Sequence, residues 1–184
     1  MDRFFGIDES GQNFSNQNFS NKWNIPIRPF TLVISYDKDP SLVSPHKRMS
    51  KLRGLHIPYL ETPFLYSYSN HFSLDVFFSL AQQLLKEATS RFCSSQDVGH
   101  VYVDNDPTGI PLDSPFFSQL SDNLSNHFQF YRGCDQTHPI LHRADNLANI
   151  ISIFHGEFDF CKRQQELYRK IYPFFDSFLE SHFV

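Results

Sequence analysis

The sequence predicts a mixed α/β fold, and two observations carry this prediction. Short apolar runs typical of strands alternate with amphipathic helical patterns, in the order strand, strand, strand, helix, strand, helix, strand, helix. Two of the short runs, residues 4–8 and 100–104, both end in an aspartate, Asp8 and Asp104. Buried strands that deliver carboxylates at their ends are typical of a sheet with a ligand site at one edge.

The first half of the chain predicts three strands and one helix. Residues 4–8 form a strand that leads into a polar loop over residues 11–24, and residues 30–36 form a β-branched, aromatic strand that pairs with it antiparallel. The third strand is expected within residues 55–59 and 64–68. A helix begins at the N-cap Ser73, and one face of it carries Leu74, Phe77, Ala81, Leu84, Leu85 and Ala88.

The second half predicts two further strands and three helices. Residues 97–104 form a short apolar strand suited to the middle of a sheet, a weaker helix covers residues 111–126, and residues 127–131 form the fifth strand. Residues 140–154 show a clear helical stripe, and residues 157–182 form a helix that bends or restarts at Pro173. Residues 1–184 are therefore expected to be one domain, in which residues 157–184 are a C-terminal helical extension.

Composition narrows the class of protein. The net charge of −4 argues against coating nucleic acid by bulk attraction, and three widely spaced cysteines predict neither a disulfide framework nor a clustered zinc site. The N-terminus lacks the pattern of a signal peptide, and no apolar run is long enough to span a membrane, so a cytoplasmic protein is expected. The 21 phenylalanines predict a well-filled core and leave room for a Phe-rich surface.

Three carboxylates on separate elements suggest one acidic site assembled by folding. Asp8 and Asp104 end strands, and Asp145 lies near the border of the apolar stripe of a helix, where a desolvated carboxylate needs a metal, an arginine or water. Arg143 lies on a different side of that helix and is a poor partner for Asp145. Each aspartate taken alone also fits a turn or cap; their combination favours a shared site.

The opening Phe5-Gly6-Ile7-Asp8-Glu9-Ser10-Gly11 resembles the F-x-D-E-S-G signature of the domain-of-unknown-function family three-thousand-eight-hundred, and residues 141–148, Leu-His-Arg-Ala-Asp-Asn-Leu-Ala, resemble its late-helix L-A-D-x-x-A motif. The element order is similar to that of the ribonuclease H-like fold, which also has acidic residues at the ends of its first and fourth strands and on a late helix. Two departures are His142-Arg143 before the Ala-Asp pair, and Asn149 where a small residue is usual. The resemblance implies a ribonuclease H-like mixed sheet flanked by helices.

Our first functional hypothesis is a metal-dependent nuclease or related phosphoryl-transfer protein. Asp8, Asp104 and Asp145 would hold Mg²⁺ or Mn²⁺ as the catalytic set. Glu9, which should face away from Asp8, would support the site together with Asp106 and His142. A basic cluster in an acidic chain is the best candidate for contacts to nucleic acid phosphates: Lys47, Arg48, Lys51 and Arg53.

The rival hypothesis is a non-catalytic ribonuclease H-like module that joins a protein partner, or a second copy of itself, through its Phe-rich surface and last helix. The acidic net charge and the lack of a helix glutamate suited to a fourth ligand favour this rival. Either protein would suit a bacterial defence or toxin-like system. For His138, His142 and His155, surface or capping roles are favoured over a zinc site.

Overall fold

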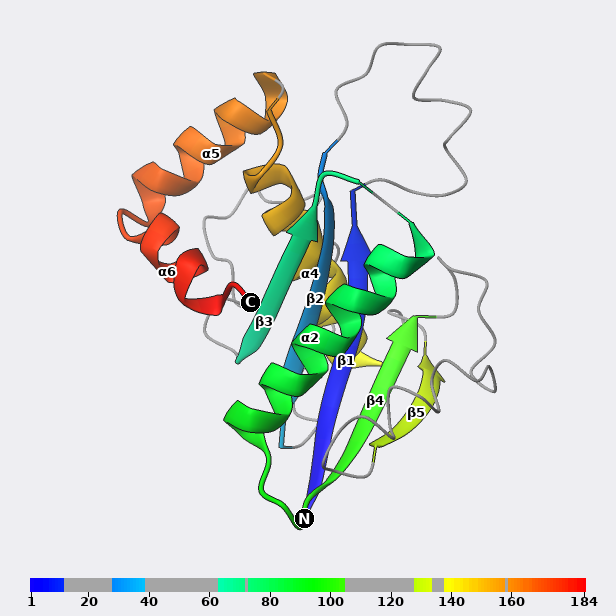
Figure 1. Cartoon of the computed structure of the whole chain (residues 1–184). Helices are drawn as coiled ribbons and strands as arrows, with labels where there is room; N and C mark the ends of the chain where they lie inside the picture. Colours follow the sequence, from blue (N-terminus) through cyan, green and yellow to red (C-terminus); the bar gives the residue numbers. More distant parts are fainter. Residues whose placement is uncertain (12–27, 39–62, 72, 105–127, 134–137, 158) are drawn as a thin grey trace.

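A computed structural model describes residues 1–11, 28–38, 63–71, 73–104, 128–133, 138–157 and 159–184. Five strands and four helices are found in these residues, and Figure 1 labels them along the chain. They are β1 (Asp2–Ser10), β2 (Phe30–Asp37), β3 (Phe64–Ser69), α2 (Leu74–Phe92), β4 (Val98–Asp104), β5 (Phe128–Gly133), α4 (Pro139–Phe154), α5 (Asp159–Ile171) and α6 (Phe175–His182).

The strands form one mixed sheet in the order β3-β2-β1-β4-β5. The first three strands are antiparallel neighbours, whereas β4 runs parallel to β1, and β5 runs parallel to β4. In Figure 1, α2 lies across the front of this sheet and α4 lies behind it. The antiparallel pairing predicted for residues 4–8 and 30–36 is confirmed, and β1 also pairs in parallel with β4.

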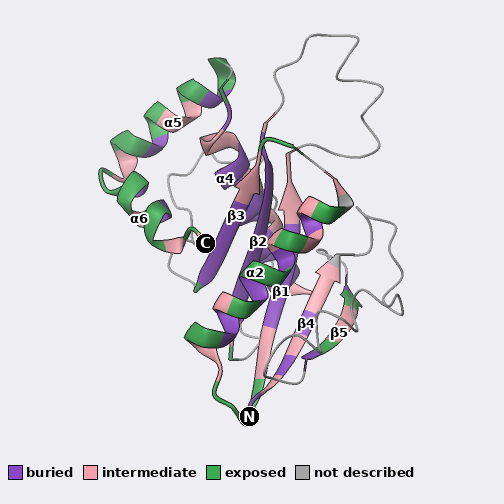
Figure 2. Ribbon diagram, viewed as in Figure 1, coloured by how far each residue is buried: buried purple, intermediate pink, exposed green. Residues whose placement is uncertain are grey.

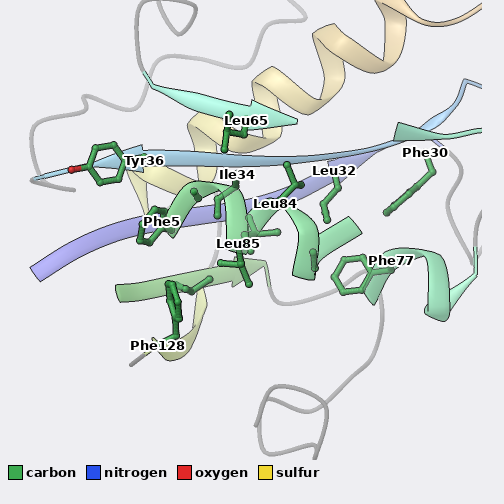
Figure 3. Packing of buried hydrophobic residues seen from close by; sticks show 14 residues of the cluster. Phe5, Phe30, Leu32, Ile34, Tyr36, Leu65, Phe77, Leu84, Leu85 and Phe128 are labelled. Carbon is green, nitrogen blue, oxygen red and sulfur yellow. The ribbon is translucent and has the colours of Figure 1, made fainter. Parts of the chain in front are cut away.

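Helix α2 covers one face of the sheet because its apolar residues recur at helical spacing. The Ser73 hydroxyl accepts the amide N–H of Val76 at 3.1 Å and so caps the first turn, as predicted. The buried stripe of α2 packs on Phe5 and Ile34 of the sheet (Figure 3). Figure 2 shows buried residues on the sheet side of this helix and exposed residues on the outer side.

A second apolar cluster lies on the opposite face and joins the last three helices to the sheet. Leu147 and Ile151 of α4 pack there with Val33 of β2, Tyr168 of α5 and Leu179 of α6. The two faces are thus both covered in the region of β1 and β2, which explains why β2 is buried along nearly its whole length.

The C-terminal segment forms two helices: α5 ends at Ile171 and α6 begins at Phe175, with Pro173 between them. This agrees with the predicted restart at Pro173. The predicted helix at 111–126 and the candidate strand at 55–59 lie outside the described residues. Within the described residues, no helix is both long enough and apolar enough to cross a membrane.

Candidate functional site

Asp8 lies near the end of β1, on the sheet face that α4 covers. Phe5 and Ile7 belong to the core beneath α2, so side-chain alternation turns Gly6 and Asp8 to the other face. Asp8 pairs directly with Val33, a member of the cluster beneath α4. Asp8 is only 5% exposed, and its Oδ1 accepts the amide N–H of Glu9 at 2.8 Å. The predicted strand therefore delivers a buried carboxylate.

Glu9 occupies the opposite face of the sheet from Asp8. It pairs with Leu32, which belongs to the core beneath α2. Directly opposed residues in an antiparallel pair project from the same face, so Glu9 belongs to the α2 side. This agrees with the prediction that Glu9 faces away from Asp8.

The backbone of Asp104 comes next to Asp8 through the parallel pairing of β1 with β4. Ile7 is the register partner of Val103, so the following position on each strand is occupied by an aspartate. On its other side, Asp104 pairs with Gly133 of β5. The side chain of Asp104, the whole of Asp106 and the basic cluster at residues 47–53 lie outside the described part of the structure.

Helix α4 runs along β1, and two contacts fix its position. The Ser35 hydroxyl donates to the carbonyl of Ile140 at 2.8 Å near the start of the helix. The Ser152 hydroxyl donates to the carbonyl of Pro29 at 3.4 Å near its end. The start of α4 also lies so close to Gly6 that a Cβ built on this glycine would be 2.5 Å from the carbonyl oxygen of Ile140.

These contacts bring Asp145 level with Asp8 along the strand direction. Five helical residues from Ile140 to Asp145 advance the chain by about 7.5 Å. Two strand residues from Gly6 to Asp8 advance it by about 6.6 Å. Asp145 is partly buried, in agreement with its predicted place at the border of the apolar stripe.

The flank of α4 that carries Asp145 faces β4 and β5. Leu141 lies one turn before Asp145 on the same side of the helix, and its side chain is the first group that a Cβ built on Gly133 of β5 would meet. Arg143 lies on the other flank, where it contacts the end of β2. The backbone thus brings the positions of Asp8, Asp104 and Asp145 to one end of the two parallel strands.

Arg143 makes an ion pair that the sequence did not predict. The side chain is 1% exposed; its Nη2 donates to Asp37 Oδ2 at 2.8 Å, and its Nη1 donates to the carbonyl of Tyr36 at 3.1 Å. A signal for its burial was present, because Arg143 lies three residues after Ile140 and four before Leu147, within the apolar stripe. Its partner Asp37 is the last residue of β2.

Two polar residues of α4, His142 and Asn149, lie about one turn from Asp145. His142 is 6% exposed, and its carbonyl accepts Nδ2 of Asn146 at 2.6 Å. One turn after Asp145, the Oδ1 of Asn149 accepts Nη1 of Arg28 at 2.8 Å. Burial lowers the pKa of the Arg28 guanidinium from its usual value. Arg28 is a cation near this helix that the sequence did not single out.

A metal site complete in itself is not present among the described side chains. No three His, Cys, Asp or Glu residues among them come together as a metal-binding group. The side chain of Asp104 is not among the described side chains and is therefore not part of this comparison. The donor chemistry nevertheless fits a hard cation, because the two described members of the proposed set, Asp8 and Asp145, supply carboxylate oxygens from a buried and a partly buried position.

Comparison with known proteins shows the fold. No protein-family model and no curated protein matches the chain, so the resemblance of the opening motif to family three-thousand-eight-hundred stays a prediction. Among solved structures, the chain is similar to RNase HII in the PCNA:RNase HII complex from Archaeoglobus fulgidus, with a TM-score of 0.53 and 13% sequence identity. The match covers 90% of this chain and 77% of that one. The fold is therefore the predicted ribonuclease H-like mixed sheet flanked by helices.

Proposed function

We propose that this protein is a metal-dependent nuclease that cleaves phosphodiester bonds in nucleic acid. One observation carries the proposal. In a ribonuclease H-like fold, Asp8 and Asp104 each follow a paired residue on two neighbouring parallel strands, and α4 carries Asp145 to the same level along the strands. An acidic cluster of this kind on rigid strands and a helix suits a reaction that requires fixed positions for its groups. The solved relative is named as a ribonuclease, which agrees with a nucleic acid substrate.

In this proposal, the carboxylates of Asp8, Asp104 and Asp145 hold Mg²⁺ or Mn²⁺. The bound cation supplies Lewis acidity and lowers the pKa of water near the scissile phosphate. The amide N–H of Glu9 holds the Asp8 carboxylate in one orientation. Burial of Asp8 keeps competing water away, which strengthens its interaction with a cation.

His142 and Asn149 would support the site from α4. Because His142 is 6% exposed, its burial favours a role in positioning Asp145 over direct contact with a nucleic acid. Arg28 donates to Asn149, which lies one helical turn after Asp145, and so adds a cation on this side of α4. Glu9 and Asp106 are proposed to support the site at longer range, and residues Lys47, Arg48, Lys51 and Arg53 are proposed to contact phosphates.

The experiment compares Mn²⁺-dependent cleavage by the wild type with cleavage by Asp8→Asn, Asp104→Asn and Asp145→Asn. Substrates are single- and double-stranded DNA and RNA and an RNA–DNA hybrid. Each substitution should reduce cleavage at least about a hundredfold, because each removes a ligand charge from the same site. The matched control is Asp159→Asn, which changes an exposed carboxylate at the start of α5 and should cleave like the wild type.

Two results would reject the proposal: no substrate is cut by the wild type, or cleavage persists in all three site variants. The rival function would then be preferred. A specific observation supports it, because Phe160 and Leu167 of α5 are 46% and 42% exposed and Phe174 is 81% exposed. Exposed apolar residues on α5 and in the connection to α6 suit a protein partner or a second copy of this chain.

A further inference from the structure

A row of aromatic rings lies on the same sheet face as α4, at strand positions before those that α4 covers. Helix α4 begins at Pro139, beside Gly6, and extends toward the later part of β1. The earlier positions on this face of β1, β4 and β5 carry Phe4, His100, Tyr102 and Tyr131. All four side chains are partly buried and keep surface accessible to solvent.

The rings contact one another in sequence across the three strands. Phe4 and His100 are stacked with centroids 5.1 Å apart, and His100 and Tyr131 are stacked at 5.7 Å. Tyr131 stacks on Tyr102 at 5.2 Å, and Tyr102 contacts His138, just before α4, also at 5.2 Å. We call Phe4, His100, Tyr131, Tyr102 and His138 the aromatic row.

Hydrogen bonds hold the middle of the aromatic row in place. His100 Nε2 lies 3.0 Å from Asp2 Oδ1, and its Nδ1 lies 3.1 Å from the Tyr131 hydroxyl. A ring held from both sides loses little freedom when a ligand binds, which favours binding. The row is therefore a prearranged surface.

The other face of the same strands shows that packing in the core does not require partly exposed aromatic rings. There, Phe5 and Val101 are fully buried beneath α2, and Ile7 is 3% exposed. A face meant only for packing has this apolar, closed character. Partly exposed rings with polar groups, by contrast, are typical of binding surfaces.

We infer that the aromatic row is a stacking platform for the bases of a single nucleic acid strand; this inference rests on the proposed nuclease function. Aromatic rings on a sheet face bind single strands through the flat faces of unpaired bases. Tyr102 lies two residues before Asp104 on β4, and His138 immediately precedes α4. A strand that follows the row toward these residues brings its backbone to the acidic end of β1 and β4.

Charge supports stacking over phosphate attraction at this surface. The chain carries a net charge of −4, and Asp2 lies at the Phe4 end of the row, bound to His100. A protein that binds mainly through phosphates loses affinity steeply as salt increases, with a slope of about −0.7 per contact for single strands. Binding to the aromatic row should therefore depend only weakly on salt.

The test is equilibrium binding to a fluorescent oligothymidylate and oligouridylate of about 15 nucleotides, a length that covers known single-strand sites. The protein is the full chain carrying Asp8→Asn, without divalent metal, so that cleavage does not interfere. Tyr102→Leu and Tyr131→Leu should each weaken binding about tenfold, as expected for the loss of one stacked base. Tyr131→Phe, which keeps the ring, should bind within about twofold of the parent.

The matched control is Tyr68→Leu, since Tyr68 is also a partly buried sheet tyrosine stacked on a histidine, His155, but lies on β3 away from the row. It should bind like the parent. A 2-aminopurine base in the oligonucleotide should be quenched by the parent and recover fluorescence in both leucine variants of the row. Thermal melting checks each variant, and either row variant suffices if the other does not fold.

Equal affinity in the parent and the folded row variants would overturn the inference, as would equal weakening by Tyr68→Leu or no single-strand binding at all. If the wild type cleaves nucleic acid, and the row variants bind and cleave it as well as the wild type does, the platform is rejected and the nuclease proposal stands. Stacking on the row without cleavage of any substrate would support the platform and reject the nuclease proposal.

Discussion

At the scale of single residues, Arg143 shows how a charge can belong to the core of this protein. Its guanidinium is surrounded by the end of β2, where a carboxylate and a backbone carbonyl both accept its N–H groups. Removing one partner of a buried ion pair costs about 3 to 5 kcal/mol, because the remaining charge stays desolvated. Arg143 therefore fixes α4 on the sheet, on the flank opposite Asp145.

Asp97 gives the first prediction at this scale, for the pH dependence of stability. The amide N–H of Ser94 and then the guanidinium of Arg3, each 2.8 Å from Asp97 Oδ2, hold the pKa of this carboxyl well below its usual value of about 3.9. A carboxyl with a lowered pKa in the folded state contributes stability above the unfolded pKa and loses it as pH falls. The wild type should therefore be more stable than Asp97→Asn near neutral pH.

Urea unfolding of both proteins at several pH values measures this effect. The difference in their free energies of unfolding should be largest near about pH 7 and should shrink below about pH 4, where the unfolded carboxyl takes up a proton. Asp75→Asn, an exposed carboxylate in the first turn of α2, is the control. A difference in the free energy of unfolding that stays constant with pH would contradict a lowered pKa of Asp97 in the folded protein.

The sequence predicts the strands that carry Asp8 and Asp104 better than it predicts the contacts around them. Apolar runs stop at Asp8 and at Asp104, which predicts a strand end at each; β4 does end at Asp104, whereas β1 continues to Ser10. Arg28 and the pair of Arg143 with Asp37 were not recognised, since both depend on contacts between residues more than 100 positions apart. Local patterns carry no direct information about such contacts.

At the scale of elements, Gly6 decides how closely α4 can approach β1. A Cβ at this position would be 2.5 Å from the carbonyl oxygen of Ile140 and 2.7 Å from its carbonyl carbon. These are backbone atoms, so they can give way only if the helix moves. Gly6 thus sets the height of Asp145 above Asp8.

We predict that Gly6→Ala destabilises the protein by about 1 to 3 kcal/mol, the usual cost of forcing extra volume into a packed interior. The amides at the start of α4 should lose protection in hydrogen exchange. Gly99→Ala is a matched control on β4, because its Cβ would meet the side chain of Phe128, on the face away from α4. Unchanged protection in α4 of the Gly6 variant, or equal loss in both variants, would contradict this account.

The helices were predictable where apolar spacing was regular. The regular spacing of apolar residues predicts α2 and α4, but the buried face of α4 also includes Arg143 and other residues outside the predicted stripe. The end of α5 and the start of α6 follow from Pro173 between them. The aromatic row was not predicted as a unit. Its rings come from strands that pair only in the folded sheet, so single-strand patterns could not join them.

At the scale of the whole molecule, the sheet lies between two apolar clusters that share its central strands. Val33 and Ile34 are neighbours on β2, yet Val33 belongs to the cluster with α4, α5 and α6, and Ile34 belongs to the cluster with α2. A change in one cluster is therefore transmitted to the other through the same strand. This arrangement predicts that the last two helices unfold together with the sheet.

We predict that Leu179→Ala in α6 and Leu84→Ala in α2 each lower the free energy of unfolding by about 2 to 5 kcal/mol, since both side chains are fully or nearly fully buried. Both variants should show one unfolding transition, with hydrogen exchange accelerated throughout the sheet. Leu167→Ala, at an exposed position of α5, should change stability by less than about 0.5 kcal/mol. If Leu179→Ala instead accelerates exchange only after residue 157, that segment is a separately unfolding extension, because its cluster with Val33 then fails to couple it to the sheet.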